Sequence, residues 1–382
     1  MASLKQYLLI PGPTPVPPEV LSALSHPMIN HRSADFKAVL SEVTEGLRWA
    51  YQTKNDVLIL TASGTGAMEA ALVNTLSPGD KVLIVNIGAF GSRFVKIAKA
   101  YGLSVDEMKI ERGKSADPKA VEQKLKDDKN KEIKAVVFQQ NETSTGVLND
   151  VKAIAEAVRS HGALSIVDAV SGLLTADLKV DEWGLDVVAS GSQKAFMVPP
   201  GLSFISMSER AWKACEASKM PRFYFDLNAA KKFAATGETP WTPCLTIAFG
   251  LQVSIKMLQK EGLENVFKRH EKLSNAVRAG VKALGFGLLA DEQCASKAVT
   301  AVVPPAGIDA EALRKAAREQ YGVVLAGGQE DLKGKIFRIG HLGYVDKMDI
   351  ITAFSALEMV GSQMGAKIKM GNAVAAVEET LK

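Results

Sequence analysis

From Asp56 onward, short runs of valine, isoleucine and leucine alternate with amphipathic segments of helix length. This alternation is typical of βαβ units and predicts an α/β fold with a mostly parallel sheet, covered by helices on both faces. Helical patterns between the runs support it, since the one over residues 150–162 opens at a capping aspartate and closes at a glycine. Seven strands are expected, at residues 57–61, 81–86, 104–109, 135–140, 164–168, 187–190 and 203–207.

A smaller α+β unit is predicted in the last third of the chain. A turn-rich stretch with prolines at residues 236–243 precedes a long helical pattern at 245–260, where the chain is expected to leave the sheet domain. Further strands are expected at residues 286–289, 299–303, 323–326 and 336–339, with helices near 309–320 and 347–360. The predicted organisation is an N-terminal segment at 1–20, a large domain at 21–255 and a small C-terminal domain at 256–382.

Composition places the chain among ordinary globular proteins. It has 382 residues, 47% hydrophobic and 23% charged, enough for two domains. The net charge of +4 is small and the basic residues are scattered, which argues against a nucleic-acid partner. Cys215, Cys244 and Cys294 lack CxxC spacing, so neither a disulfide framework nor a zinc site is expected.

Targeting signals are not evident in the sequence. The N-terminal apolar run is four residues long, too short for a signal-peptide core, and no stretch approaches the roughly 18 apolar residues of a membrane helix. We therefore expect a cytoplasmic protein without a membrane partner.

The segment TASGTGAMEAAL at residues 61–72 follows a predicted strand and opens a predicted helix. Its backbone N–H groups and the positive helix end can bind a phosphate group. A dinucleotide fingerprint would need a third glycine where this chain has Glu69, and a Walker loop would need a Gly-Lys-Ser/Thr ending. Both nucleotide interpretations are disfavoured. Taken alone, the segment fits a small-residue turn without a ligand equally well.

Three further residues have candidate chemistry. Asp168 ends an apolar strand, where open α/β sheets form ligand crevices, although a helix cap or structural hydrogen bond is the commoner role. Lys194 has apolar residues on both sides, and a partly desolvated amine is the type that forms Schiff bases. Arg338 lies in a predicted strand of apolar residues, and its planar fork suits a carboxylate.

In combination these motifs resemble the class V aminotransferases of fold type I, in the branch of alanine:glyoxylate and serine:glyoxylate aminotransferases. The resemblance covers essentially the whole chain. It begins at LLIPGPTPVPPEV and continues through TASGTG, NETSTG, VDAVS, SGSQKAF, TPWTP and FRIGHLG in the family's order. It implies pyridoxal 5'-phosphate as cofactor, amino acid and oxo acid substrates, and a homodimer with shared active sites.

The resemblance also implies roles for individual residues. Lys194 would form the Schiff base with the cofactor, and Asp168 would contact the pyridinium nitrogen. Thr143 would lie near the ring hydroxyl, and Thr242 would reach the phosphate of the neighbouring subunit. The other expected contacts are to the cofactor phosphate, from Ser63, Gly64, Thr65 and Gln193, and to the substrate, from Gly12 and Arg338.

The chain departs from the family's pattern at two positions. Phe90 stands where some relatives stack a tryptophan on the cofactor ring; it can still stack but lacks an indole N–H. Thr239 stands where some relatives have a phosphate-contacting tyrosine. His31 and Arg32 resemble the pair that receives a substrate phosphate in phosphoserine aminotransferases, and a polar helix start is an equally good interpretation.

The expected reaction is amino transfer from alanine or serine to glyoxylate. The alternatives are a phosphoserine aminotransferase, a cysteine desulfurase, or a binding protein that keeps the fold without catalysis. A desulfurase needs a reactive cysteine on a mobile loop, and Cys294 lies in an ordinary charged turn. The presence of Lys194, Asp168 and Arg338 argues against a non-catalytic protein.

Overall fold

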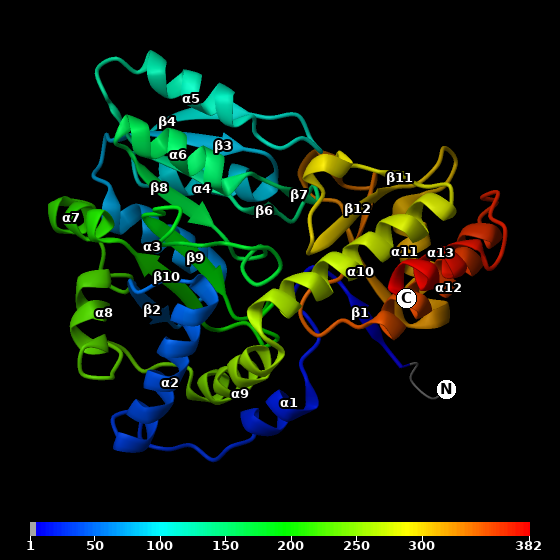
Figure 1. The fold of residues 1–382 in the computed structure, drawn as a ribbon, viewed down its shortest axis with the longest axis horizontal. Helices are drawn as coiled ribbons and strands as arrows, with labels where there is room; N and C mark the ends of the chain where they lie inside the picture. Colours follow the sequence, from blue (N-terminus) through cyan, green and yellow to red (C-terminus); the bar gives the residue numbers. More distant parts are fainter. Residues whose placement is uncertain (1–4) are drawn as a thin grey trace.

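The computed structural model describes residues 5–382 and contains the predicted seven-stranded sheet (Figure 1). The strand order is β2-β10-β9-β8-β5-β3-β4. Only β10 runs antiparallel to its neighbours, so the sheet is mostly parallel, as predicted. The strands are β2 (Asp56–Leu60), β3 (Lys81–Asn86), β4 (Ser104–Lys109), β5 (Ile133–Gln139), β8 (Leu164–Asp168), β9 (Val187–Gly191) and β10 (Ser203–Met207).

Helices cover both faces of this sheet, because successive strand residues point to opposite sides. Val136 and Phe138 pack into one core with α2, α5, α6 and α9, while Ala135 and Val137 pack into the other with α3, α4, α7 and α8. Asp150 caps α6 and Gly162 ends it in the left-handed conformation, as predicted. The helices are α2 (Ala34–Tyr51), α3 (Gly64–Thr75), α4 (Ala89–Ala100), α5 (Pro118–Asp127), α6 (Val151–His161), α7 (Glu209–Ala217), α8 (Leu227–Ala234) and α9 (Leu245–Glu261).

A second sheet has the order β1-β13-β14-β12-β11 and its own apolar core. Its C-terminal strands confirm the four predicted ones, but β1 (Tyr7–Leu9) was not predicted as a strand and pairs in parallel with β13. The other strands are β11 (Gly287–Leu288), β12 (Val299–Val303), β13 (Val323–Gly327) and β14 (Phe337–Gly340). The associated helices are α10 (Leu263–Ala283), α11 (Ala310–Tyr321), α12 (Lys347–Gln363) and α13 (Asn372–Leu381).

Strand β1 therefore lies among C-terminal elements, and Figure 1 shows it beside the last helices. From β1 the chain continues to α1 (Pro18–Leu24), which packs against α9. The segment between β1 and α1 contacts Lys194 of the large sheet. The division at residues 20 and 255 stays a prediction. Across residues 5–382, no helix has both the length and the apolar character needed to span a membrane.

Candidate active site

Lys194 lies in the turn after β9, and its side chain is almost fully buried. Its Nζ donates a hydrogen bond to the main-chain oxygen of Pro11 at 2.6 Å. Burial, followed by the positive charge of Arg338, lowers the pKa of the Lys194 amine to about 8. A far larger fraction of this amine than of an ordinary lysine is therefore uncharged near neutral pH, and the uncharged form is the one that attacks a carbonyl carbon.

Asp168 is the last residue of β8, which lies next to β9 in the sheet. Its Oδ1 accepts a hydrogen bond from the backbone N–H of Val170 at 2.9 Å. Burial raises the pKa of the Asp168 carboxyl to about 7, and Glu142 adds to the rise, whereas Lys194 and Arg93 oppose it. A carboxylate in such surroundings gains from a positively charged ligand group.

The predicted phosphate loop forms the start of α3. Ser63 is the N-cap residue and is exposed, and among the described residues its hydroxyl makes no capping hydrogen bond. Gly64 has no room for a side chain, because a Cβ there would lie 2.7 Å from Cγ2 of Val170. The Oε1 atom of Gln193 is buried without a hydrogen-bond partner within residues 5–382. The loop thus offers backbone N–H groups to a ligand, and the Gln193 side chain, which follows β9, adds an unpartnered polar atom.

Phe90 and Thr143 lie in the segments that follow β3 and β5, respectively. Phe90 lies in the first turn of α4, and its ring faces the guanidinium of Arg93 at 4.6 Å. Arg93 also donates a hydrogen bond to Oγ1 of Thr65 at 2.9 Å, which joins α4 to the phosphate loop. The hydroxyl of Thr143 donates to Ser171 Oγ at 2.7 Å.

Arg338 lies on β14 of the second sheet, and its side chain extends to Thr143, in the segment that follows β5 of the large sheet. Its Nε donates to the main-chain oxygen of Gly327 at 2.8 Å, and its Nη1 donates to that of Thr143 at 3.0 Å. Burial lowers the pKa of Arg338 to about 10. Within residues 5–382, no carboxylate lies within ion-pair distance of this guanidinium. A buried arginine without an acidic partner is a candidate binding group for a carboxylate.

Gly12 is held against Lys194 by its backbone shape. Its φ of +135° is rarely adopted by residues with a side chain, and a Cβ there would lie 2.5 Å from the Nζ of Lys194. Thr14 completes this contact by donating its hydroxyl to the Lys194 carbonyl at 2.9 Å.

Four of the expected residues lie apart from this group within one chain. Arg32 forms an ion pair with Glu238, and His31 is its half-buried neighbour. Thr239 donates a hydrogen bond to the carbonyl of Trp241 at 2.7 Å, and Thr242 is exposed.

Two charged residues of the site were not predicted from the sequence. Glu142 is fully buried, and its carboxylate accepts hydrogen bonds from the backbone N–H groups of Phe90 and Gly91 and from Ser144. It therefore fixes the start of α4. Arg93 is the other. Glu142 stands inside the NETSTG motif, but nothing in the letters shows that its carboxylate is buried.

The arrangement fits a phosphorylated aromatic aldehyde. The N–H groups at the N-terminus of α3 suit a phosphate, and Phe90 offers a face for an aromatic ring. The buried Asp168 suits a protonated ring nitrogen, and the partly neutral Lys194 suits an aldehyde. Among residues 5–382, no group of three or more His, Cys, Asp or Glu is placed to hold a metal ion.

A family comparison matches this chain to the model described as aminotransferase class-V, over residues 6–338. The chain belongs to the class V aminotransferases. It is an aminotransferase whose cofactor is pyridoxal 5'-phosphate, as the sequence predicted.

Full-length relatives carry different names. The soluble hydrogenase 42 kDa subunit of Anabaena cylindrica is 48% identical, with 94% of each chain covered. The L-aspartate–glyoxylate aminotransferase of Paracoccus denitrificans is 38% identical, covering 97% of this chain and 95% of the relative. The serine–glyoxylate aminotransferase of Methylorubrum extorquens is also 38% identical, covering 99% and 96%.

A solved structure has the same fold along the whole chain. The ureidoglycine–glyoxylate aminotransferase of Bacillus subtilis superposes with a TM-score of 0.93 at 34% identity, covering 100% of this chain and 99% of the other. The expected fold type is therefore confirmed.

Proposed function

We propose that this aminotransferase moves the amino group of alanine or serine to glyoxylate. The observation that carries the proposal is Arg338, a buried guanidinium without an acidic ion-pair partner in the described chain. Arg338 lies close enough to Lys194 for its charge to lower the pKa of the amine. One such cation suits the carboxylate that small amino acids and glyoxylate share. Three of the relatives named above act on glyoxylate according to their names, which supports this acceptor.

An acidic donor is the second candidate, because Arg93 is a further cation near the amine. Its charge lowers the pKa of Lys194, and one relative is named for aspartate. Arg93 is engaged with Thr65 and with the ring of Phe90, so it is less available than Arg338. We therefore favour the small, uncharged donors.

The proposed roles follow from charge and position. Pyridoxal phosphate, when bound, supplies the electron sink for the charge that develops at the donor Cα. Asp168 would hold a proton on the ring nitrogen through its buried carboxylate. Lys194 would anchor the cofactor. Once the donor has displaced it, its uncharged amine would accept the proton from the donor Cα, and in the second half of the reaction it would give a proton to the Cα of the new amino acid. Arg338 would orient the substrate carboxylate with its planar fork.

Turnover of defined donors and acceptors tests this assignment. We would measure kcat/KM for alanine, serine, aspartate and phosphoserine with glyoxylate, pyruvate or 2-oxoglutarate, in wild type, Lys194→Ala and Arg338→Gln. Lys213→Ala, which removes an exposed lysine of α7, is the control. We expect Lys194→Ala to be inactive and borohydride to fix the cofactor on Lys194 in wild type. Another donor or acceptor preferred by about tenfold, or roughly 1.4 kcal/mol, would overturn the substrate assignment.

We also propose a homodimer in which Thr242 serves the partner's cofactor. A surface patch of Phe223, Tyr224 and the half-buried Trp241 supports this. Phe223 is 76% exposed, and the centroid of its ring lies 4.9 Å from that of Trp241. The Tyr224 hydroxyl contacts the carbonyl of Thr61, beside the phosphate loop. Exposed apolar patches of this kind mark interfaces.

We also propose a cytoplasmic location. The three cysteines form no disulfide, which supports this location.

A further inference from the structure

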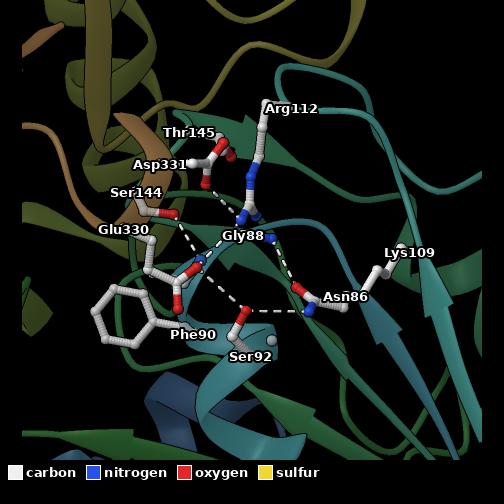
Figure 2. Close-up of polar contacts among 12 residues, drawn as sticks. Asn86, Gly88, Phe90, Ser92, Lys109, Arg112, Ser144, Thr145, Glu330 and Asp331 are labelled. Atoms are coloured by element: carbon white, nitrogen blue, oxygen red, sulfur yellow. Dashed lines mark hydrogen bonds and ion pairs between the residues drawn. The ribbon is translucent and has the colours of Figure 1, made fainter. Parts of the chain in front are cut away.

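Glu330 lies in the short helix η2 (Glu330–Leu332), between β13 and β14, and is the centre of a polar network (Figure 2). Its Oε2 accepts hydrogen bonds from Arg112 at 3.1 Å and from Ser92 Oγ at 3.2 Å. Lys96 lies 3.8 Å from its other oxygen. Arg112 donates a further bond to Asp331 at 2.9 Å. The Glu330 carboxylate is thus contacted by three donor side chains, those of Arg112, Ser92 and Lys96.

All three donors belong to the large sheet and its helices, whereas Glu330 belongs to the second sheet. Ser92 and Lys96 lie on α4, two and six residues after Phe90, and Arg112 follows β4. Ser92 is itself anchored, because its hydroxyl accepts a hydrogen bond from Asn86 at the end of β3 at 3.1 Å. Figure 2 shows Glu330 between Arg112 on one side and Ser92 on the other. The network therefore joins the two sheets beside the active site.

The same short loop fixes Arg338. Gly327, three residues before Glu330, supplies the carbonyl that accepts the Arg338 Nε hydrogen bond at 2.8 Å. The loop has little freedom, since a Cβ at Gly328 would lie 2.0 Å from the carbonyl oxygen of Leu332. Glu330 has a φ of +50°, which a residue with a side chain rarely adopts. Its contacts to the large sheet hold this conformation in place.

We propose that Glu330 is a positioning residue that sets Arg338 for the substrate carboxylate. It acts through the Gly327 carbonyl, which accepts the Arg338 Nε hydrogen bond. In this way Glu330 would fix the position of the Arg338 guanidinium relative to α4 and Phe90. The proposal rests on the function proposed above, in which Arg338 binds the carboxylate of donor and acceptor. Without the three donors, η2 is no longer held against α4. The guanidinium then keeps its hydrogen bond to the Thr143 carbonyl, but its second acceptor, the Gly327 carbonyl, is held less firmly.

The test compares two carboxylates that each bridge the sheets. Glu330→Gln removes the charge of the network, and Asp291→Asn removes the ion pair to Lys114 at 2.7 Å, which also joins the two sheets but lies outside the Gly327 loop. Arg112→Met attacks the network from the other side. We would measure KM and kcat for glyoxylate and the best wild-type donor, and hydrogen–deuterium exchange over residues 327–340.

We expect Glu330→Gln and Arg112→Met each to raise KM about twofold to fivefold, with kcat little changed. The rise in KM of the double variant should be no larger than that of the more impaired single variant, because both substitutions disrupt the same network. Exchange over residues 327–340 should be faster in both variants and unchanged in Asp291→Asn.

An unchanged KM in Glu330→Gln, or an equal rise in Asp291→Asn, would overturn the positioning role. An inactive wild type would instead refute the proposed function. In that case the exchange rates alone decide whether Glu330 holds the loop that follows Gly327, the residue whose carbonyl accepts the Arg338 hydrogen bond.

Discussion

The main-chain oxygen of Pro11 accepts a hydrogen bond from the Nζ of Lys194 at 2.6 Å, although 183 positions separate the two residues. Pro11 follows β1, which is paired with the second sheet, and Lys194 follows β9 of the large sheet. A neutral acceptor holds the amine without strongly favouring its charged form, as a carboxylate would. The segment from β1 to Pro11 thus both links the two sheets and positions the amine.

Gly12→Ala should disturb this contact directly. The new Cβ would lie 2.5 Å from the Lys194 Nζ, so the lysine must move, and overpacking of this kind costs about 1–3 kcal/mol. We expect weaker cofactor attachment, seen as loss of the visible absorbance, together with a lower Tm. Gly79→Ala is the control, because Gly79 also has a positive φ but nothing within 4 Å. Equal loss of cofactor in both variants would contradict the steric argument.

Asp168→Asn should make the apoprotein more stable above neutral pH while abolishing transamination. Folding raises the pKa of this carboxyl from its ordinary 3.8 to about 7. The folded state therefore binds the proton more tightly, and the resulting penalty is absent below about pH 4 and complete above about pH 7. Three pKa units correspond to about 4 kcal/mol, an upper bound.

Denaturant unfolding of the apoprotein at pH 5 and pH 8 measures this effect. The free energy of unfolding of Asp168→Asn should exceed that of wild type by more at pH 8 than at pH 5. A difference that does not grow with pH would show that the carboxyl is ionised at little cost in the folded apoprotein.

Arg338→Gln should raise the pKa of Lys194, because the charge of Arg338 is the second cause of its lowering, after burial. In wild-type apoprotein, attachment of the cofactor should accelerate with pH and level off above about pH 8, since only the uncharged amine attacks. In the variant the same rise should occur at higher pH. Stopped-flow absorbance measures the rate, and Arg318→Gln on the surface of α11 should leave the profile unchanged.

Much of this fold could be predicted from the sequence, because most strands of the large sheet are short runs rich in valine, isoleucine and leucine that alternate with segments of helix length. Strand β1 could not, since three residues carry no periodic signal and its pairing with β13 is a contact across 316 positions, as between Tyr7 and Val323. Lys194 and Asp168 stood out by their apolar flanks and strand ends. The burial of Glu142 and the reach of Arg93 depend on tertiary packing, which the pattern along the chain does not contain.

The dimer proposal predicts that two inactive variants restore each other's activity. Lys194→Ala removes the anchoring amine, and Thr242→Glu places a negative charge where the proposal puts the partner's phosphate. In a mixed dimer, one site would carry both defects and the other neither. Unfolding and refolding the two variants together should therefore recover about one quarter of wild-type activity, as random pairing of a symmetric dimer predicts.

Thr236→Glu is the matched control, because Thr236 is also an exposed threonine after α8 and is not expected at the phosphate. Alone it should stay active, whereas Thr242→Glu alone should lose cofactor. Analytical ultracentrifugation would show whether refolded samples are dimers. Dimers without recovered activity would mean that Thr242 serves its own chain or no cofactor, since a site built from both chains must regain one intact copy whenever unlike subunits pair.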